Sequence, residues 1–242
     1  MSESDPATHA GEPHDASLGA RLNWLRAGVL GANDGIVSTA GIVAGVAGAT
    51  SDRGEILTAG IAGLVAGALS MAAGEYVSVS AQRDTEKSLI AKEKDELASM
   101  PEAELEELTE LYQRRGLTPG TARKVAEELT AKDPLRAHLD IELGIDPDDL
   151  VSPWHAVFAS AVSFVIGALL PILAVIVAPD GSRIPVTFVA VVLALALTGF
   201  ISSRIGDART RQARAIARNV VGGALAMTIT YLVGTAVGGL GV

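Results

Sequence analysis

The sequence Gly31-Ala-Asn-Asp34-Gly35 places a carboxylate inside a long apolar stretch. From Ala27 to Ala49, Asp34 is the only ionisable side chain, and most other positions are glycine, alanine, valine or isoleucine. A stretch of this length and hydrophobicity can cross a bilayer as a helix. Because a charge inside a bilayer is costly, a residue such as Asp34 is by default a functional-site candidate. The stretch therefore predicts a membrane-spanning helix with a functional carboxylate.

Four further stretches have the same apolar character. Small residues dominate them, which suits close packing of helices in lipid. The five predicted spans are 27–49, 56–80, 154–178, 184–202 and 215–238. The predicted fold is all-α: a five-helix transmembrane bundle with a helical domain inserted between spans two and three.

The net charge of −9 is confined to one segment. Residues 84–149 contain 18 acidic and 9 basic side chains, whereas the charges of the remaining residues cancel. An acidic segment argues against nucleic acid as a partner and is compatible with cation binding. The chain has no cysteine, so any metal must be held by oxygen, imidazole or thioether ligands.

Composition and turn signals divide the chain into four parts. Residues 1–20 are polar and lack the basic and apolar regions of a signal peptide, which predicts a disordered cytosolic tail. Residues 21–83 hold spans one and two, 84–150 form an acidic helical domain, and 151–242 hold spans three to five. Within and beside the acidic domain, breaks at proline and glycine predict helices over 82–99, 102–115, 119–132 and 134–143.

Basic residues predict the orientation. Arg21, Arg26, the basic residues of 83–94 and the five arginines of 201–218 fall on one side of the predicted membrane. The other side has only Arg53 and Arg183. Because cytosolic loops are enriched in lysine and arginine, we expect the N-terminus and the acidic domain to be cytosolic.

Three residues of the first two spans are candidates for a transport path. Asp34 lies eight residues after Arg26, which is about 12 Å along a helix. Glu75 lies eight residues before Arg83 and is expected at the same depth, with Met71 one turn deeper on the same helix face. Oxygen and thioether ligands together suit softer ions such as Fe²⁺. The alternative is that Glu75 faces the headgroups and Met71 is apolar filler.

The acidic domain carries three pairs of metal-binding side chains at helical spacing. Such pairs project from one helix face, as in carboxylate metal sites of helix bundles. The pairs are Glu93 with Glu96, Glu104 with Glu107, and His138 with Glu142. Glutamate is also a common solvent-facing residue, so a hydrated surface is the alternative interpretation.

Taken as a set, three motifs resemble the vacuolar iron transporter family. They are Gly31-Ala-Asn-Asp34-Gly35, Ala68-Leu-Ser-Met71 followed by Gly74-Glu-Tyr-Val, and Glu142-Leu-Gly. The resemblance covers about residues 20–240, including the five spans and the inserted helical domain. This family comprises plant and yeast transporters that move Fe²⁺ and Mn²⁺ out of the cytosol. The resemblance implies a homodimer, an ion path between the first spans, and exchange of metal for protons.

The resemblance also implies roles for individual residues. The family's intramembrane Asp and Met match Asp34 and Met71, and the Glu pairs of its metal-binding domain match Glu93, Glu96, Glu104 and Glu107. Two departures stand out. The family's Met-xxx-Glu pair falls on His138 and Glu142, so an imidazole replaces a thioether. Asn23 stands where the family has a glutamate near the cytosolic end of the first span.

We therefore expect a divalent metal exporter that holds no permanent cofactor. The transported ions are expected to be Fe²⁺ or Mn²⁺, with Zn²⁺ and Co²⁺ as further candidates, and protons and the lipid bilayer complete the partners. The Ala-, Gly- and Arg-rich spans favour a bacterial plasma membrane. One rival is a di-iron oxidase, which needs two Glu-xx-His pairs that this chain lacks. The other is a metal sensor without transport, which leaves Asp34 unexplained.

Overall fold

The structure is a computed structural model that describes residues 17–148, 150–205 and 212–240, with side chains from Arg26 onward except at position 205. It divides into two compact units. We call residues 78–152 the acidic unit, and residues 21–77 together with 153–242 the membrane unit.

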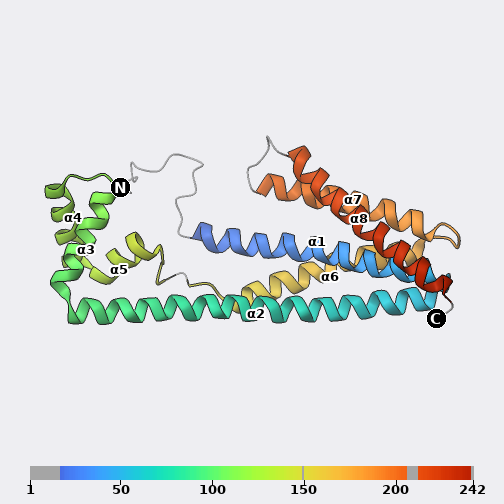
Figure 1. Cartoon of the computed structure of the whole chain (residues 1–242), viewed down its shortest axis with the longest axis horizontal. Coiled ribbons are helices and arrows are strands. Elements are labelled where there is room, and N and C mark those ends of the chain that lie inside the picture. The colour runs from blue at the N-terminus through green and yellow to red at the C-terminus, as the bar shows by residue number, and fades with distance from the viewer. Residues whose placement is uncertain (1–16, 149, 206–211, 241–242) are drawn as a thin grey trace, which may run out of the picture. The chain divides into compact units, whose positions relative to one another are not determined.

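All the described elements are helices (Figure 1). The membrane unit contains α1 (Ser17–Ala49), the first part of α2 (Arg53–Ser99), α6 (Pro153–Val177), α7 (Arg183–Ile205) and α8 (Gln212–Gly239). The acidic unit contains the rest of α2, α3 (Pro101–Arg114), α4 (Pro119–Lys132), α5 (Pro134–His138) and the π-helix η1 (Leu139–Leu143). Among the described residues, five helices are long and apolar enough to cross a membrane. The all-α prediction with five candidate spans is therefore confirmed.

Close backbone contacts hold α1 against its neighbours in the membrane unit. A Cβ atom added at Gly35 would collide with the backbone oxygen of Phe164 on α6, and one added at Gly234 on α8 would collide with the backbone of Gly45. Only glycine permits such an approach, which in lipid brings the van der Waals contact that holds helices together. Buried side chains of α1, α7 and α8, including Ile36, Leu195 and Met227, form a core beside these contacts. α1 is thus packed against at least three other helices.

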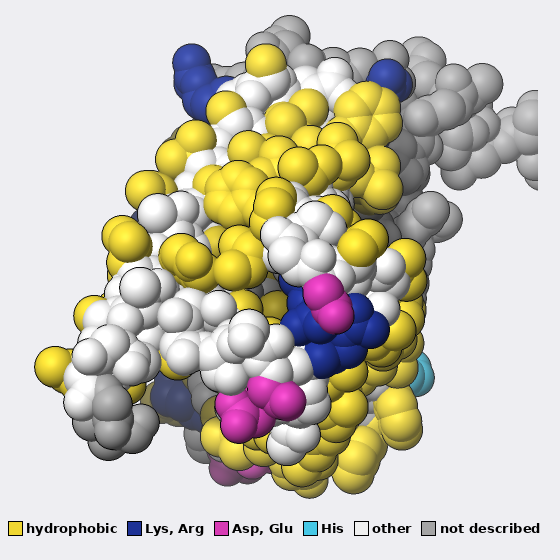
Figure 2. Space-filling view, turned by 90° about the vertical axis from the view of Figure 1, so that its right-hand side faces the viewer, with side chains coloured by type: hydrophobic (Ala, Val, Ile, Leu, Met, Phe, Trp, Pro, Cys, Tyr) yellow, Lys and Arg dark blue, Asp and Glu magenta, His cyan; other side chains and the backbone are white. Residues whose placement is uncertain are grey.

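Two arginines connect the α1–α2 turn to the α6–α7 turn at one end of the membrane unit. Arg53 donates from Nη2 to the carbonyl oxygen of Ala178 and to Oδ1 of Asp180, each at 3.0 Å. Arg183 donates in return to the carbonyl oxygen of Ser51 at 2.8 Å and also pairs with Asp180. Figure 2 views this end and shows basic side chains flanked by acidic ones on a largely hydrophobic face. We call it the hairpin end.

Several boundaries differ from the sequence predictions. The expected single helix over 134–143 is divided into α5 and η1, and Gly144 ends it with φ +62°. The expected tail lies outside the described residues as far as position 16, and α1 already begins at Ser17. Two of the five connecting arginines, at 209 and 211, and the side chain of Asn23 also lie outside the described part.

Candidate metal-binding site

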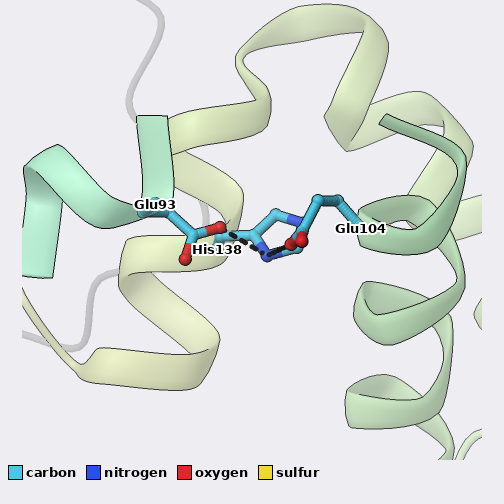
Figure 3. A group of neighbouring side chains, drawn as sticks. All are labelled: Glu93, Glu104 and His138. Atoms are coloured by element: carbon cyan, nitrogen blue, oxygen red, sulfur yellow. Dashed lines mark ion pairs between the residues drawn. The ribbon is translucent and has the colours of Figure 1, made fainter. Parts of the chain in front are cut away.

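A sharp turn between α2 and α3 brings two glutamates towards each other. Met100 is the single residue between these helices, and its amide donates to the carbonyl oxygen of Glu96 at 2.8 Å. The amide of Glu104 donates back to the carbonyl oxygen of Met100 at 3.0 Å. Pro101 follows at the first helical position, where its missing N–H has no cost. This geometry turns the chain within one residue and places Glu93 and Glu104 on facing helices (Figure 3).

The third member of the site comes from α5. Oδ1 of Asp133 accepts a hydrogen bond from the amide of Arg136 at 3.0 Å, which caps the start of this helix. Ala137 packs into an apolar core with Leu108 and Ala126. His138 is the next residue and is fully buried. The cap and the core together fix the position of the imidazole.

The imidazole of His138 lies between three carboxylates. Its Nδ1 is 3.0 Å from Oε1 of Glu93, 3.7 Å from Oε2 of Glu104 and 3.7 Å from Oε2 of Glu142. The donor atoms of Glu93, Glu104 and His138 all lie within 4.8 Å of one another (Figure 3). The side chains of these three residues are 5%, 7% and 1% exposed. We call Glu93, Glu104 and His138 the buried triad.

Two members of the buried triad, Glu93 and His138, have polar atoms that are left unsatisfied by hydrogen bonds within the described part of the protein. Both ring nitrogens of His138 and Oε1 of Glu93 are buried without a hydrogen-bond partner, although Nδ1 and Oε1 lie 3.0 Å apart. Buried polar atoms are rarely left unpaired. Neighbouring ligands on an octahedral ion with bonds of about 2.1 Å lie about 3 Å apart. The 3.0 Å between His138 and Glu93 matches this spacing, whereas Glu104 at 3.7 Å would have to move closer. The donors therefore fit a divalent cation with oxygen and imidazole ligands.

Burial and crowding raise the pKa of both glutamates. For Glu93, loss of hydration is the largest cause, and the charges of Glu142, Glu104 and Glu96 act in the same direction against His138. For Glu104, loss of hydration again comes first, followed by the charge of Glu107. A raised carboxyl pKa means that the ionised form is disfavoured without a nearby cation. The site thus holds negative charge that a metal ion would neutralise.

The other predicted ligands of this site lie around the buried triad. Glu142 reaches towards His138 and is partly exposed, whereas Glu107 lies on the exposed surface of α3. Glu96 is half-buried and forms an ion pair with Lys92 at 2.8 Å. Lys92 was not among the candidate residues, although its i,i+4 spacing from Glu96 predicts this pair. The structure thus brings Glu93, Glu104 and Glu142 to the imidazole of His138, with Glu142 the most exposed of the three, and leaves Glu96 and Glu107 at the rim.

In the membrane unit, contacts between α1 and α2 indicate how Asp34, Met71 and Glu75 are aligned along the two helices. Gly60 of α2 meets Val43 of α1, and Gly63 meets Ile42. Continuing this antiparallel register brings Met71 level with Asp34. Glu75 then lies about one turn nearer the N-terminus of α1. Counting residues from the flanking arginines instead placed Glu75 level with Asp34 and Met71 one turn deeper.

The Asp34 carboxylate has a polar but sparsely bonded environment. Its side chain is half-buried and forms no hydrogen bond or ion pair with another described residue, as is also true of Glu75. Nearby in the sequence, Oδ1 of Asn33 is buried without a partner. Ser160, which packs against Gly31, likewise has an unpaired buried hydroxyl. Asn33 and Ser160 escaped the sequence analysis, because uncharged polar residues are common in tightly packed spans.

These features define a class of protein: a helical multi-span membrane protein whose separate acidic unit carries a carboxylate–imidazole cluster suited to a divalent cation. Residues 25–235 match the model of the VIT family. The chain belongs to this family.

Three relatives illustrate the likeness. A vacuolar iron transporter of Acanthamoeba castellanii is 43% identical over 231 residues, which are 93% of this chain and 82% of the relative. Vacuolar iron transporter homolog 1 of Oryza sativa is 38% identical, covering 88% of this chain and 73% of the relative. Vacuolar iron transporter homolog 1 of Arabidopsis thaliana is 35% identical, covering 89% and 86%. The family resemblance is thus confirmed, and the protein is a membrane transporter rather than an enzyme.

Proposed function

We propose that this protein exports Fe²⁺ or Mn²⁺ from the cytosol in exchange for protons. The observation that carries the proposal is the buried triad, whose donor atoms lie within 4.8 Å of one another and include unpaired atoms of Glu93 and His138. The names of the relatives support iron as a transported ion. Carboxylate and imidazole ligands suit Fe²⁺ and Mn²⁺, and also Zn²⁺ and Co²⁺, which are therefore secondary candidates.

Capture of the ion is the proposed task of the acidic unit. Its surplus of carboxylates raises the local concentration of cations. Glu107 and Glu142, which are accessible to water, would meet the hydrated ion first. Glu93, Glu104 and His138 would then replace water ligands in the buried interior. Glu96, partly neutralised by Lys92, would tune the charge of the site.

Passage through the membrane is the proposed task of Asp34. Met71 lies level with it and offers a thioether, while Glu75 offers a carboxylate one turn away. Carboxylates must be deprotonated to bind metal, and they take up protons when the metal leaves. Alternate occupation of Asp34 by metal and by a proton would couple the two fluxes in opposite directions.

The assembly and location are part of the same proposal. We place the acidic unit in the cytosol because arginine and lysine are concentrated on that side of the spans. The family resemblance favours a homodimer with the ion path between the first spans. The most apolar window of α2 is only 11% buried, which leaves room for a second copy. The composition of the spans favours a bacterial plasma membrane.

A flux assay tests this function. The full chain is reconstituted into proteoliposomes with an acidic lumen, and uptake of Fe²⁺, Mn²⁺, Co²⁺ and Zn²⁺ is followed with an internal indicator. We expect uptake of Fe²⁺ or Mn²⁺ that falls when a protonophore removes the pH gradient. Metal binding without uptake would instead identify a sensor, and oxygen-dependent conversion of Fe²⁺ to Fe³⁺ would identify an oxidase.

A further inference from the structure

An exposed apolar stripe of α8 ends in two arginines. Val221, Leu225, Ile229 and Leu232 recur at helical spacing and are between 56% and 60% exposed. The same spacing continued towards the start of the helix reaches Arg218 and then Arg214, which are both exposed. Side chains three or four residues apart share one face of a helix. The apolar stripe and the two arginines therefore form one continuous face.

The neighbouring helix repeats this arrangement in the opposite chain direction. Leu193, Leu197 and Ile201 are exposed on α7 at the same spacing. Arg204 follows one turn later and is also exposed. Its guanidinium lies over the ring of Phe200, 5.1 Å from the ring centre, which restricts the side chain. This apolar stripe thus also ends in an arginine.

Tight packing fixes these arginines at one end of the membrane unit. A Cβ atom at Gly199 of α7 would lie 2.8 Å from Cα of Ile216 on α8, so the helices are nearly in backbone contact. Nδ2 of Asn219 donates to Oγ1 of Thr198 at 3.5 Å in the same region. Because the helices are antiparallel neighbours, the end of α7 and the start of α8 present Arg204, Arg214 and Arg218 together. We call this the arginine end.

We propose that the arginine end binds the headgroup of an anionic phospholipid, with the acyl chains lying along the exposed stripes of α7 and α8. Guanidinium groups bind phosphate through paired, charge-assisted hydrogen bonds. Basic residues beside membrane spans attract anionic lipids within a Debye length of the surface. The apolar stripes select a lipid over a soluble phosphate, because they supply contacts only for acyl chains. If these arginines served only to orient the spans in the membrane, their positive charge would be explained. Their alignment with the apolar stripes of α7 and α8 would not be.

Native mass spectrometry of the delipidated full chain tests the proposal. The probes are dioleoylphosphatidylglycerol and dioleoylphosphatidylcholine, which share acyl chains and differ in net charge. We expect the wild type to prefer phosphatidylglycerol by about 100-fold, since each of the three arginines contributes roughly fivefold at a charged surface. Arg204→Gln/Arg214→Gln/Arg218→Gln should abolish the preference. Arg114→Gln/Lys124→Gln/Lys132→Gln removes the same charge from exposed positions of the acidic unit and should retain it.

Two further arms keep the proposal falsifiable. If the triple variant does not fold, Arg214→Gln alone should reduce the preference severalfold. Millimolar inorganic phosphate should leave lipid binding unchanged. The proposal is wrong if the folded arginine variants bind phosphatidylglycerol like the wild type, if both lipids bind equally, or if phosphate displaces the lipid. None of these outcomes depends on metal transport.

Discussion

The buried triad and the Asp34 region offer metal ligands in two different ways. At the triad, three helices fix donor atoms within 4.8 Å of one another, and both carboxylates carry raised pKa values. At Asp34, the helices are packed just as tightly through glycine, yet the carboxylate has no polar partner among the described residues. A preorganised cluster favours selective binding, whereas a single poorly coordinated carboxylate favours rapid release. The comparison suggests that capture and passage are separate steps performed by separate residues.

Removal of two triad ligands should have the largest effect on metal binding. Glu93→Gln/Glu104→Gln replaces both buried carboxylates with neutral groups of similar size. We expect the Mn²⁺ affinity of the full chain in detergent to fall by at least about 100-fold, because two charged ligands are lost. Titration calorimetry measures this change.

The matched control is Glu102→Gln/Glu128→Gln, which removes the same charge from exposed positions of α3 and α4. Its affinity should change by less than about threefold, through long-range electrostatics alone. Equal losses in the two variants would show that the triad acts only through net charge.

A larger side chain in the Asp34 region should destabilise the membrane unit without weakening metal binding at the buried triad. Gly35→Ala forces α1 away from the backbone of Phe164, which costs about 3 kcal/mol and lowers the melting temperature by roughly 10 °C. Gly74→Ala adds the same atom on α2 where the described structure has nothing within 4 Å, and should be neutral. Thermal unfolding in detergent compares the two. Equal melting temperatures would contradict the close contact between α1 and α6.

The raised pKa values predict that the empty triad opposes stability at neutral pH. When a carboxyl pKa is higher in the folded state, the folded state binds more protons, so stability falls as pH rises through that pKa. Glu93→Gln should therefore melt a few degrees above the wild type at pH 7.5 in EDTA, with a smaller difference near pH 4.5. Its metal binding should nevertheless be weaker. A destabilised Glu93→Gln variant at pH 7.5 would refute the raised pKa.

Substitution of Glu107, at the rim of the site, should have the smallest effect on metal binding. Glu107 is exposed and acts on Glu104 through its charge, so Glu107→Gln should weaken Mn²⁺ binding only about threefold. The loss should shrink further at high ionic strength, whereas that of the Glu93→Gln/Glu104→Gln variant should persist. A larger effect, independent of salt, would make Glu107 a direct ligand.

Much of this organisation could be predicted from sequence because the signals are local. The apolar stretches gave all five spans, and Pro101, Gly116 and Pro134 placed the helix breaks of the acidic unit. The i,i+3 and i,i+4 spacings singled out Glu93, Glu104 and His138 as candidates. Their juxtaposition depends on the one-residue turn at Met100 and on the packing of α5, which no spacing rule contains.

The order of residues along the membrane normal was harder to predict. Counting from flanking arginines placed Glu75 level with Asp34, whereas the glycine contacts between α1 and α2 bring Met71 to that level. Register between two helices is set by which small residues meet, and both helices offer many glycines. The unpaired polar atoms of Asn33 and Ser160 were not predicted either, because uncharged polar residues are common in tightly packed spans.

The dependence of Mn²⁺ flux on Mn²⁺ concentration tests the two-step account most directly. Proteoliposomes with an acidic lumen are prepared from wild type, Glu93→Gln/Glu104→Gln and Asp34→Asn. We predict that the triad variant has low flux at micromolar Mn²⁺ and approaches the wild-type rate at saturating Mn²⁺, since only capture is weakened. Asp34→Asn should bind Mn²⁺ normally in detergent and give background flux at every concentration. Wild-type flux through Asp34→Asn would contradict the account.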